Sequence, residues 1–305
     1  MNGDDIINTI TIIICSIALI PSVFLIIYQK VKQRKGIDVF LNYVLCSCCI
    51  IESVYYFLGM NSGVTVCHIK GVLMVIADIM RMSIGLIKLL LLRIEHYQNL
   101  GIEQSKTTED DFLFCMTFIF TLFVPIIFGL SSLLWGNINY TTLGNCYPYN
   151  TGYKLFLYIL SILYYFIFFF FLYEIVVKAK LYQEKMAYTL REDSFCYESI
   201  TQTQTPIFNT LLSYGIVQAL NFFLILMFLV YLFLERFTDD SSPLRKLVGS
   251  YVYKVFAMIV QCFLFLLFLI IYGYHSITLK DIKDFICCRG PKINVKTYNN
   301  YLIKN

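Results

Sequence analysis

Residues 164–171 read YYFIFFFF, a run of aromatic and aliphatic side chains inside a longer apolar segment, 152–178. In a water-soluble protein such a run would favour a buried strand. A membrane offers another solution, because a helix of about 20 apolar residues crosses about 30 Å of hydrocarbon. Segment 152–178 is long enough to do so. We therefore predict that it is a membrane-spanning helix surrounded by lipid.

The composition of the whole chain agrees with a membrane protein. Of its 305 residues, 58% are hydrophobic and 17% are aromatic, while only 14% are charged. A soluble domain of this length cannot bury so much apolar surface, whereas a bilayer covers it. The net charge of +4 is modest. We see no basic surface with interleaved aromatic side chains and expect no nucleic-acid partner.

Seven segments are long and apolar enough to cross a bilayer. They are residues 6–29, 38–60, 67–97, 112–135, 152–178, 206–235 and 247–274. Each is expected to be helical, because hydrocarbon offers no partner for unpaired backbone groups. The first segment follows the acidic start MNGDD instead of a positive leader region, so we interpret it as a span. The sequence predicts an all-α membrane protein with a seven-helix bundle over residues 1–275.

The basic residues predict on which side of the membrane each loop lies. With the N-terminus outside, sixteen Lys and Arg side chains fall in the inner loops and tail, and four fall in the outer loops. The sequon at Asn139 falls in the second outer loop, where we predict glycosylation. We therefore expect a plasma-membrane protein with an extracellular N-terminus and a cytoplasmic C-terminus.

A short amphipathic segment follows the last span. Its apolar residues recur on one helical face, with Lys and Asp on the other, until Gly290 and Pro291 end the pattern. The apolar residues are Leu279, Ile282, Phe285 and Ile286. We predict an eighth helix on the inner membrane surface, followed by a cytoplasmic tail, within residues 276–305. Cys287 and Cys288 at the end of this helix are placed for palmitoylation.

Two further cysteines, together with the predicted helices, resemble an arrangement found in a known family. Cys67 stands at the outer end of the third span, and Cys146 lies in the second outer loop. With seven spans and an eighth helix ending in cysteines, the arrangement over residues 1–291 resembles the G-protein-coupled receptors. The resemblance implies a disulfide between Cys67 and Cys146. It also implies an extracellular small-molecule ligand and a heterotrimeric G protein as the cytoplasmic partner.

Within that superfamily the likeness is narrower. The third span ends Leu92-Arg93-Ile94, without the acidic residue that precedes the arginine in rhodopsin-like receptors. The sixth span lacks their Cys-Trp-x-Pro pattern, and the outer N-terminal segment is short. The chain is therefore most similar to the slime-mould cyclic-AMP receptor family. We expect Arg93, at the inner end of its span, to take part in G-protein coupling.

Ionisable side chains within the third span predict paired or functional sites, because charges are costly in hydrocarbon. Lys70, Arg81 and Lys88 fall on one helical face, which we expect to point into the bundle. Asp78 lies three residues before Arg81, a spacing at which the two side chains pair. The span thus carries a cationic stripe with one carboxylate beside it.

Partners for this stripe are expected on neighbouring spans at matching depth. Glu52 on the second span is expected to neutralise Lys70 or Arg81, and Glu174 on the fifth span is expected to pair with Lys88. If all of these charges pair internally, they serve only to hold the helices together.

The alternative to internal pairing is a ligand site at the outer mouth of the bundle. Positive charge at the mouth would attract an anionic ligand such as a nucleotide or a carboxylate, although lysines at an interface also simply extend toward water. The candidate ligand-binding residues are Glu52, Lys70, Asp78, Arg81, Asn221 and Lys254.

Two other functions stay open from the sequence. A microbial-rhodopsin-like retinal protein has seven helices and a lysine on the last, but Lys254 lies only about two turns from the outer end of its span. A small transporter or channel also places charges at mid-membrane, but we find no internal repeat. The histidines lack metal-ligand spacing and no phosphate-binding glycine loop is present, so we expect no enzyme activity, metal or cofactor.

Overall fold

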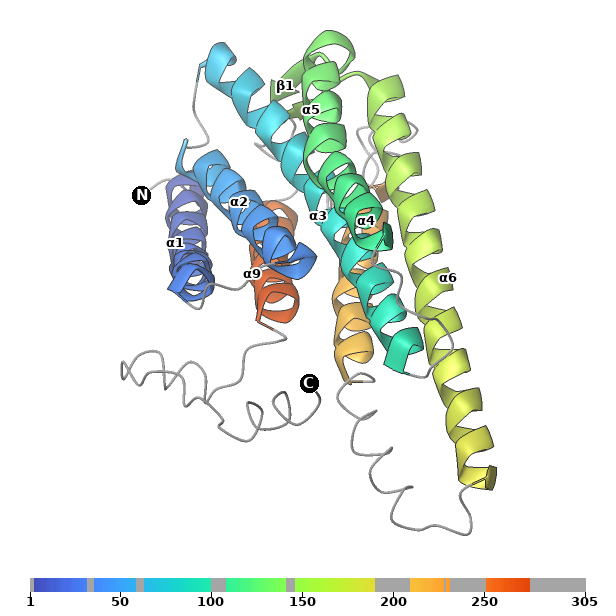
Figure 1. Cartoon of the computed structure of the whole chain (residues 1–305). Helices are drawn as coiled ribbons and strands as arrows, with labels where there is room; N and C mark the ends of the chain where they lie inside the picture. The colour runs from blue at the N-terminus through green and yellow to red at the C-terminus, as the bar shows by residue number, and fades with distance from the viewer. Residues whose placement is uncertain are drawn as a thin grey trace.

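The computed structural model describes residues 3–31, 36–58, 63–99, 108–140, 146–189, 209–227, 229–230 and 251–274. Most of these residues are helical. The first three helices are α1 (Gly3–Val31), α2 (Ile37–Phe57) and α3 (Val64–Asn99). They are followed by α4 (Thr108–Phe118), η1 (Ile119–Phe123), α5 (Val124–Trp135) and α6 (Thr151–Thr189), and then by the helix Asn209–Met227 and α9 (Tyr251–Gly273) (Figure 1).

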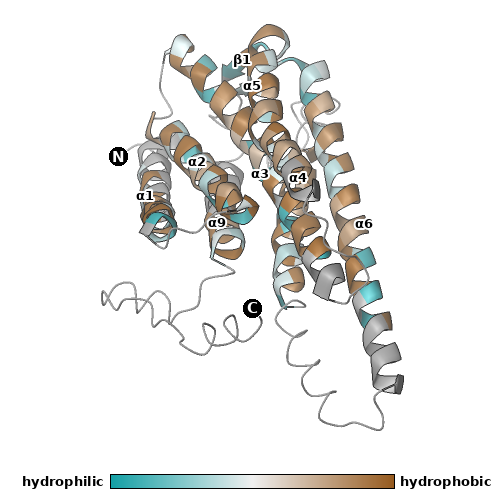
Figure 2. Cartoon of the chain, viewed as in Figure 1, coloured by the Kyte–Doolittle hydropathy of each residue, from teal (hydrophilic) through white to brown (hydrophobic). Residues whose placement is uncertain are grey.

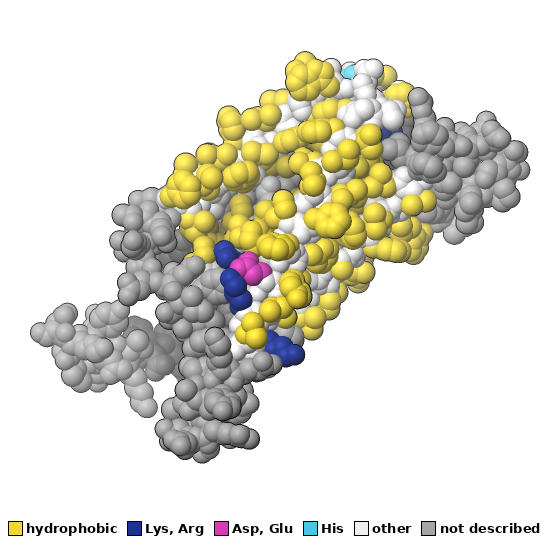
Figure 3. Space-filling model, turned by 90° about the vertical axis from the view of Figure 1, so that its right-hand side faces the viewer, with side chains coloured by type: hydrophobic (Ala, Val, Ile, Leu, Met, Phe, Trp, Pro, Cys, Tyr) yellow, Lys and Arg dark blue, Asp and Glu magenta, His cyan; other side chains and the backbone are white. Residues whose placement is uncertain are grey.

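Four stretches of the described helices are long and apolar enough to cross a membrane. They are Ile37–Tyr55, Phe112–Trp135, Thr151–Lys178 and Asn209–Met227. Figure 2 shows that hydrophobic residues dominate the helices, and the face seen in Figure 3 is covered mainly by hydrophobic side chains. Large side chains such as Phe166 and Phe170 on α6 are exposed, which suits contact with lipid. These helices indicate a membrane protein.

The described helices begin and end near the predicted spans. The largest difference is in α6, which continues from the predicted end at residue 178 to Thr189. The predicted end of the sixth span and the predicted start of the seventh lie outside the described residues. The predicted amphipathic helix, with Cys287 and Cys288, also lies outside them.

The predicted fourth span is interrupted in its middle by a π-helical turn. This turn, η1, comes directly before Val124 and Pro125. Proline has no N–H to donate and clashes within a regular helix, so a wider turn beside it relieves the strain. The hydroxyls of Thr117 and Thr121 each donate to the carbonyl one turn earlier at 2.7 Å, which satisfies them within the apolar segment.

The connection between α5 and α6 contains a small antiparallel hairpin. Strand β1 (Ile138–Tyr140) pairs with β2 (Cys146–Pro148), and Asn139 lies opposite Tyr147. Asn137 turns the chain out of α5 with a φ of 49°, a region that asparagine tolerates. The sequence did not predict this hairpin, because span length and hydropathy carry no information about pairing between short loop segments.

Helix α3 is central to the described residues. It packs against α2, α5, α6 and both strands, and α2 in turn packs against α1 and α9 (Figure 1). A disulfide joins Cys67 near the start of α3 to Cys146 on β2, with a Cα–Cα distance of 5.3 Å, which confirms the expected pairing. Gly71 allows the hairpin to approach closely, because a Cβ there would lie 2.4 Å from a methyl group of Ile138.

Candidate functional site

The interface between α2 and α3 holds Glu52, Asp78 and Arg81, which we call the acid–arginine cluster. Arg81 Nη2 lies 2.5 Å from Asp78 Oδ1 and 3.2 Å from Glu52 Oε1. Only 7% of Arg81 and 2% of Glu52 is exposed. The expected Asp78–Arg81 pair is confirmed, and Arg81 is the cation that contacts Glu52.

The charge balance of this cluster determines what else it can bind. With both carboxylates ionised, two negative charges surround one guanidinium. Because Arg81 already contacts two carboxylates, it offers little to an additional anion. The Asp78 side chain is 29% exposed, compared with 3% for that of Glu52. Asp78 is therefore the most exposed member of the cluster.

Strand β2 brings a phenol into the electrostatic field of the cluster. Burial, together with the Asp78 carboxylate, raises the pKa of Tyr147 well above its usual value. The Tyr147 ring also packs on an apolar group that includes Val75 of α3 and Leu157 of α6. The hairpin is thus anchored to both helices on the Asp78 side of α3.

Lys70 lies on α3 between the disulfide and the acid–arginine cluster. Its ammonium nitrogen is 4.8 Å from the ring centre of Tyr55 on α2, and only 2% of the residue is exposed. The electron-rich face of an aromatic ring attracts a cation at this distance. Eight residues separate Lys70 from Asp78, which is about 12 Å along a helix axis. Lys70 and Asp78 therefore lie at different depths along α3.

Lys88 connects three helices further along α3. Its Nζ atom lies 3.1 Å from Asp38 Oδ1, 2.6 Å from Asn42 Oδ1 and 2.6 Å from the carbonyl oxygen of Tyr272. Asp38 and Asn42 belong to α2, and Tyr272 belongs to α9. An ammonium group has three protons, so these three acceptors satisfy it. The contacts indicate that Lys88 holds the helices together.

The expected pair between Lys88 and Glu174 is wrong. Glu174 of α6 instead contacts Arg93 at 3.3 Å and Lys178 on its own helix. The prediction matched the depths of Lys88 and Glu174 by counting residues from the predicted ends of their spans. Helices α3 and α6 both continue beyond those predicted ends, and by different lengths. Sequence reasoning missed Asp38 and Asn42. Their spacing of four residues, which places both on one face of α2, was the available signal.

Arg93 connects α3 to α6 near the other end of α3 from the disulfide. Its Nη2 atom is 3.3 Å from Glu174 Oε1, and its guanidinium carbon is 5.7 Å from the ring centre of Phe171. In Figure 3, basic and acidic side chains of the described residues gather mostly toward one end of the visible face. Because this contact joins α3 to α6, a change in the spacing of the two helices would alter it directly.

A second polar contact links α9 to the helix Asn209–Met227. Gln218 Nε2 donates to Tyr272 Oη at 3.0 Å, and the Tyr272 ring stacks on that of Tyr214 with centroids 4.1 Å apart. Gly85 of α3 makes room for it, because a Cβ there would lie 2.4 Å from Gln218 Nε2 and 2.7 Å from Tyr164 Oη. Four helices therefore meet around Gly85.

The remaining predicted site residues are placed only in part. Asn221 is buried on the helix Asn209–Met227, with 9% exposed. Lys254 lies in α9, but its side chain is outside what the structure describes, so its ligand role stays a prediction. Asn139 is exposed in β1, and its glycosylation also stays a prediction. Among the described residues, no group of three His, Cys, Asp or Glu side chains is arranged to hold a metal ion.

Comparison with known proteins does not assign this chain to a family. No protein-family model matches the chain, and no curated protein matches it.

Proposed function

We propose that this chain is a seven-helix receptor of the G-protein-coupled type. It binds an extracellular small molecule beside the hairpin and engages a heterotrimeric G protein at the opposite end. The observation that carries the proposal is the Cys67–Cys146 disulfide, which holds a hairpin against one end of α3 while Arg93 lies toward the other. In the proposal, the four apolar spans are joined by α1, α3 and α9 to make seven.

The orientation follows from the chemistry of the two ends. Disulfides persist in oxidising surroundings, so the hairpin end is assigned to the extracellular side. The excess of Lys and Arg in the loops at the other end agrees, because basic loops stay in the cytoplasm. The protein then lies in the plasma membrane with its N-terminus outside, and Arg93 and Glu174 lie toward the cytoplasm.

The ligand site is assigned to the α2–α3 interface between the disulfide and the acid–arginine cluster. Because Arg81 is already paired twice, the anionic group of the ligand is assigned to Lys70, which is 2% exposed in this structure, so that in the proposal α2 and α3 separate around Lys70 when the ligand binds. The exposed part of Asp78 then accepts a hydrogen bond from a donor on the same ligand. The two residues are about 12 Å apart along the helix, which suits a nucleotide-sized molecule better than a single amino acid.

Signalling is assigned to the contact between α3 and α6. A ligand shifts a conformational equilibrium only if it binds the two states with different affinity. In the proposal, the Arg93–Glu174 pair favours the resting state, and its opening frees Arg93 for the G protein. Lys178 also contacts Glu174, but it lies on the same helix and does not join α3 to α6.

The test is a ligand screen on the full chain co-expressed with a panel of G proteins, with nucleotide exchange as the readout. Nucleotides and other anionic metabolites are expected to stimulate exchange. Lys70→Gln is expected to raise the half-maximal ligand concentration at least tenfold, whereas Lys178→Gln is not. Arg93→Ala is expected to abolish stimulated exchange while surface expression is kept.

Three results would contradict the proposal. One is exchange that no ligand stimulates and no variant alters. Another is solute flux in proteoliposomes without any G protein, which would favour a transporter or channel. The third is a visible absorption band with added retinal that Lys254→Ala removes, which would favour a retinal protein.

A further inference from the structure

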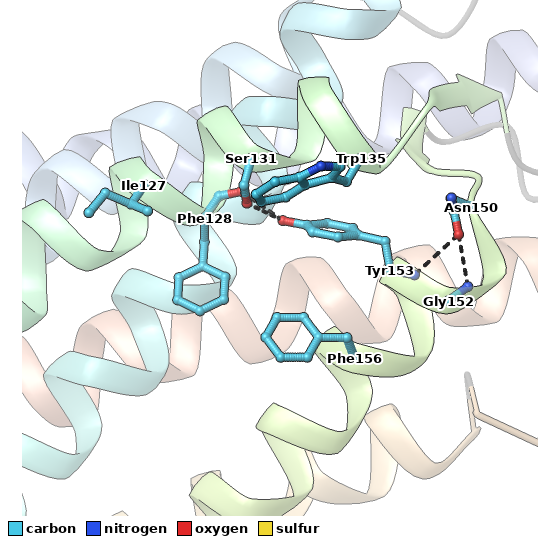
Figure 4. A pocket seen from close by; sticks show the side chains of 8 residues that line it. All are labelled: Ile127, Phe128, Ser131, Trp135, Asn150, Gly152, Tyr153 and Phe156. Carbon is cyan, nitrogen blue, oxygen red and sulfur yellow. Dashed lines mark hydrogen bonds between the residues drawn. The ribbon is translucent and has the colours of Figure 1, made fainter.

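We propose that a groove between α5 and α6 binds a sterol from the membrane through the sterol hydroxyl. The groove has a volume of about 460 Å³. Its lining comes from the end of α5 and the start of α6, as Figure 4 shows: Ile127, Phe128, Ser131, Trp135, Asn150, Gly152, Tyr153 and Phe156. None of these residues belongs to the α2–α3 interface, so this site is separate from the proposed receptor site.

The groove opens toward lipid. It lies between Phe112–Trp135 and Thr151–Lys178, two of the candidate membrane spans. Its rim is exposed, with 66% of Trp135 and 49% each of Ile127 and Phe156 accessible. In a bilayer such a surface is covered by hydrocarbon and not by water. The occupant is therefore drawn from the membrane itself.

Aromatic rings make up part of the walls of the groove. The rings of Phe128 and Phe156 are stacked with centroids 6.0 Å apart and planes within 13°. Tyr153 lies beside Phe156, with ring centroids 6.3 Å apart and planes tilted by 45°. A rigid fused-ring lipid covers aromatic faces with little loss of conformational freedom, whereas an acyl chain must be ordered bond by bond. The shape of the walls thus favours a sterol over a phospholipid tail.

One wall carries two hydroxyl groups that together act as a hydrogen-bond acceptor. Ser131 Oγ and Tyr153 Oη lie 2.7 Å apart, and both reach the carbonyl oxygen of Phe128, at 2.8 and 2.9 Å. Whichever hydroxyl donates to the other, both protons are used within this group, and at least one oxygen lone pair is left over. A ligand oxygen that donates a proton fits there, and one that only accepts does not.

The hydroxyl pair lies at the depth where a sterol carries its polar end. Ser131 is four residues before Trp135, where α5 ends, so it is about 6 Å below the end of the helix. Tryptophan and tyrosine gather at this level of membrane proteins. Asn150 Oδ1 accepts hydrogen bonds from the backbone N–H of Gly152 at 2.9 Å and of Tyr153 at 3.3 Å, which caps α6 and fixes the position of Tyr153.

The test uses the full chain in phosphatidylcholine nanodiscs and a photoreactive 3-hydroxysterol, with labelled peptides mapped by mass spectrometry. Labelling is expected on the peptides that contain 127–135 and 150–156. Excess cholesterol is expected to compete about three- to tenfold better than its 3-ketone, which has lost the donating proton. Equal competition by the alcohol and the ketone would overturn the proposal.

Variants separate the hydroxyl contact from general lipid contact. Ser131→Ala is expected to weaken labelling, and the double variant Ser131→Ala with Tyr153→Phe is expected to abolish the preference for the alcohol. Tyr153 joins α5 to α6, so the double variant is compared with the wild type only if its unfolding temperature is unchanged. If the double variant does not fold, the result for Ser131→Ala alone tests the hydroxyl contact. Phe156→Ala is expected to reduce labelling, whereas Phe166→Ala, also on the lipid face of α6, is not. Equal labelling in all variants, or equally efficient labelling of the same peptides by a photoreactive phosphatidylcholine, would refute sterol binding.

Discussion

The ammonium group of Lys88 on α3 donates a hydrogen bond to the backbone carbonyl oxygen of Tyr272 on α9, at 2.6 Å. The phenol of the same tyrosine accepts a hydrogen bond from Gln218 on the helix Asn209–Met227. Asp38 and Asn42 complete the surroundings of Lys88 from α2. One buried cation therefore sets the relative position of helices that are far apart along the chain. Its removal has consequences beyond the loss of one ion pair.

Lys88→Met is expected to destabilise the protein. The change removes three hydrogen bonds and leaves Asn42 and the Tyr272 carbonyl without this donor, whereas Asp38, whose side chain is 46% exposed, is rehydrated. We expect a loss of about 3 kcal/mol in the free energy of unfolding. Thermal unfolding in detergent measures it, with Lys178→Met as the matched control, since the side chain of Lys178 is 49% exposed. Equal effects of the two changes would contradict a structural role for Lys88.

The acid–arginine cluster predicts an asymmetry between its members. Arg81→Met leaves two carboxylates facing each other in apolar surroundings and is expected to cost about 3–5 kcal/mol. Glu52→Gln keeps a polar side chain beside Arg81, which still pairs with Asp78, and is expected to cost less than about 1.5 kcal/mol. The free energy of unfolding of the two variants tests this order. A Glu52→Gln variant as unstable as Arg81→Met would mean that Asp78 does not balance Arg81.

The disulfide between Cys67 and Cys146 closes a loop with a sequence separation of 79 residues. Cys146→Ser is expected to lower stability by about 2–4 kcal/mol, because the unfolded chain gains freedom. It is also expected to weaken the response to ligand, since the hairpin is no longer tied to α3. Unfolding temperature and ligand-stimulated exchange are the readouts. Cys115→Ser, at an exposed free cysteine, is the control and is expected to change neither.

The Arg93–Glu174 contact predicts a change in basal signalling. Glu174→Gln weakens the attraction between α3 and α6 and is expected to raise nucleotide exchange without ligand several-fold. Lys178→Gln removes the other partner of Glu174 and leaves the contact with α3 in place, so its basal exchange is expected to stay low. A similar basal rate in wild type and both variants would show that this contact does not restrain the resting state.

Local features were predictable from the sequence. Four of the predicted spans coincide with helices that are long and apolar enough to cross a membrane, because hydropathy accumulates along a continuous segment. The Asp78–Arg81 pair was found because residues three apart share a helical face. For Glu52 the sequence left two partners open, Lys70 and Arg81, and only the packing of α2 on α3 decided that it contacts Arg81.

Contacts between segments that are far apart in the chain were harder to predict from the sequence. The sequence by itself determined a membrane protein of apolar helices with a charged stripe on 67–97, because these properties depend on near neighbours in the chain. The tertiary structure decided that Lys88 contacts Asp38 and Tyr272, and that Glu174 contacts Arg93. It also decided that Ser131 and Tyr153 face one groove. These partners depend on where each helix ends and which faces meet, and a shift of one helical turn, about 5.4 Å, is enough to exchange one ion pair for another.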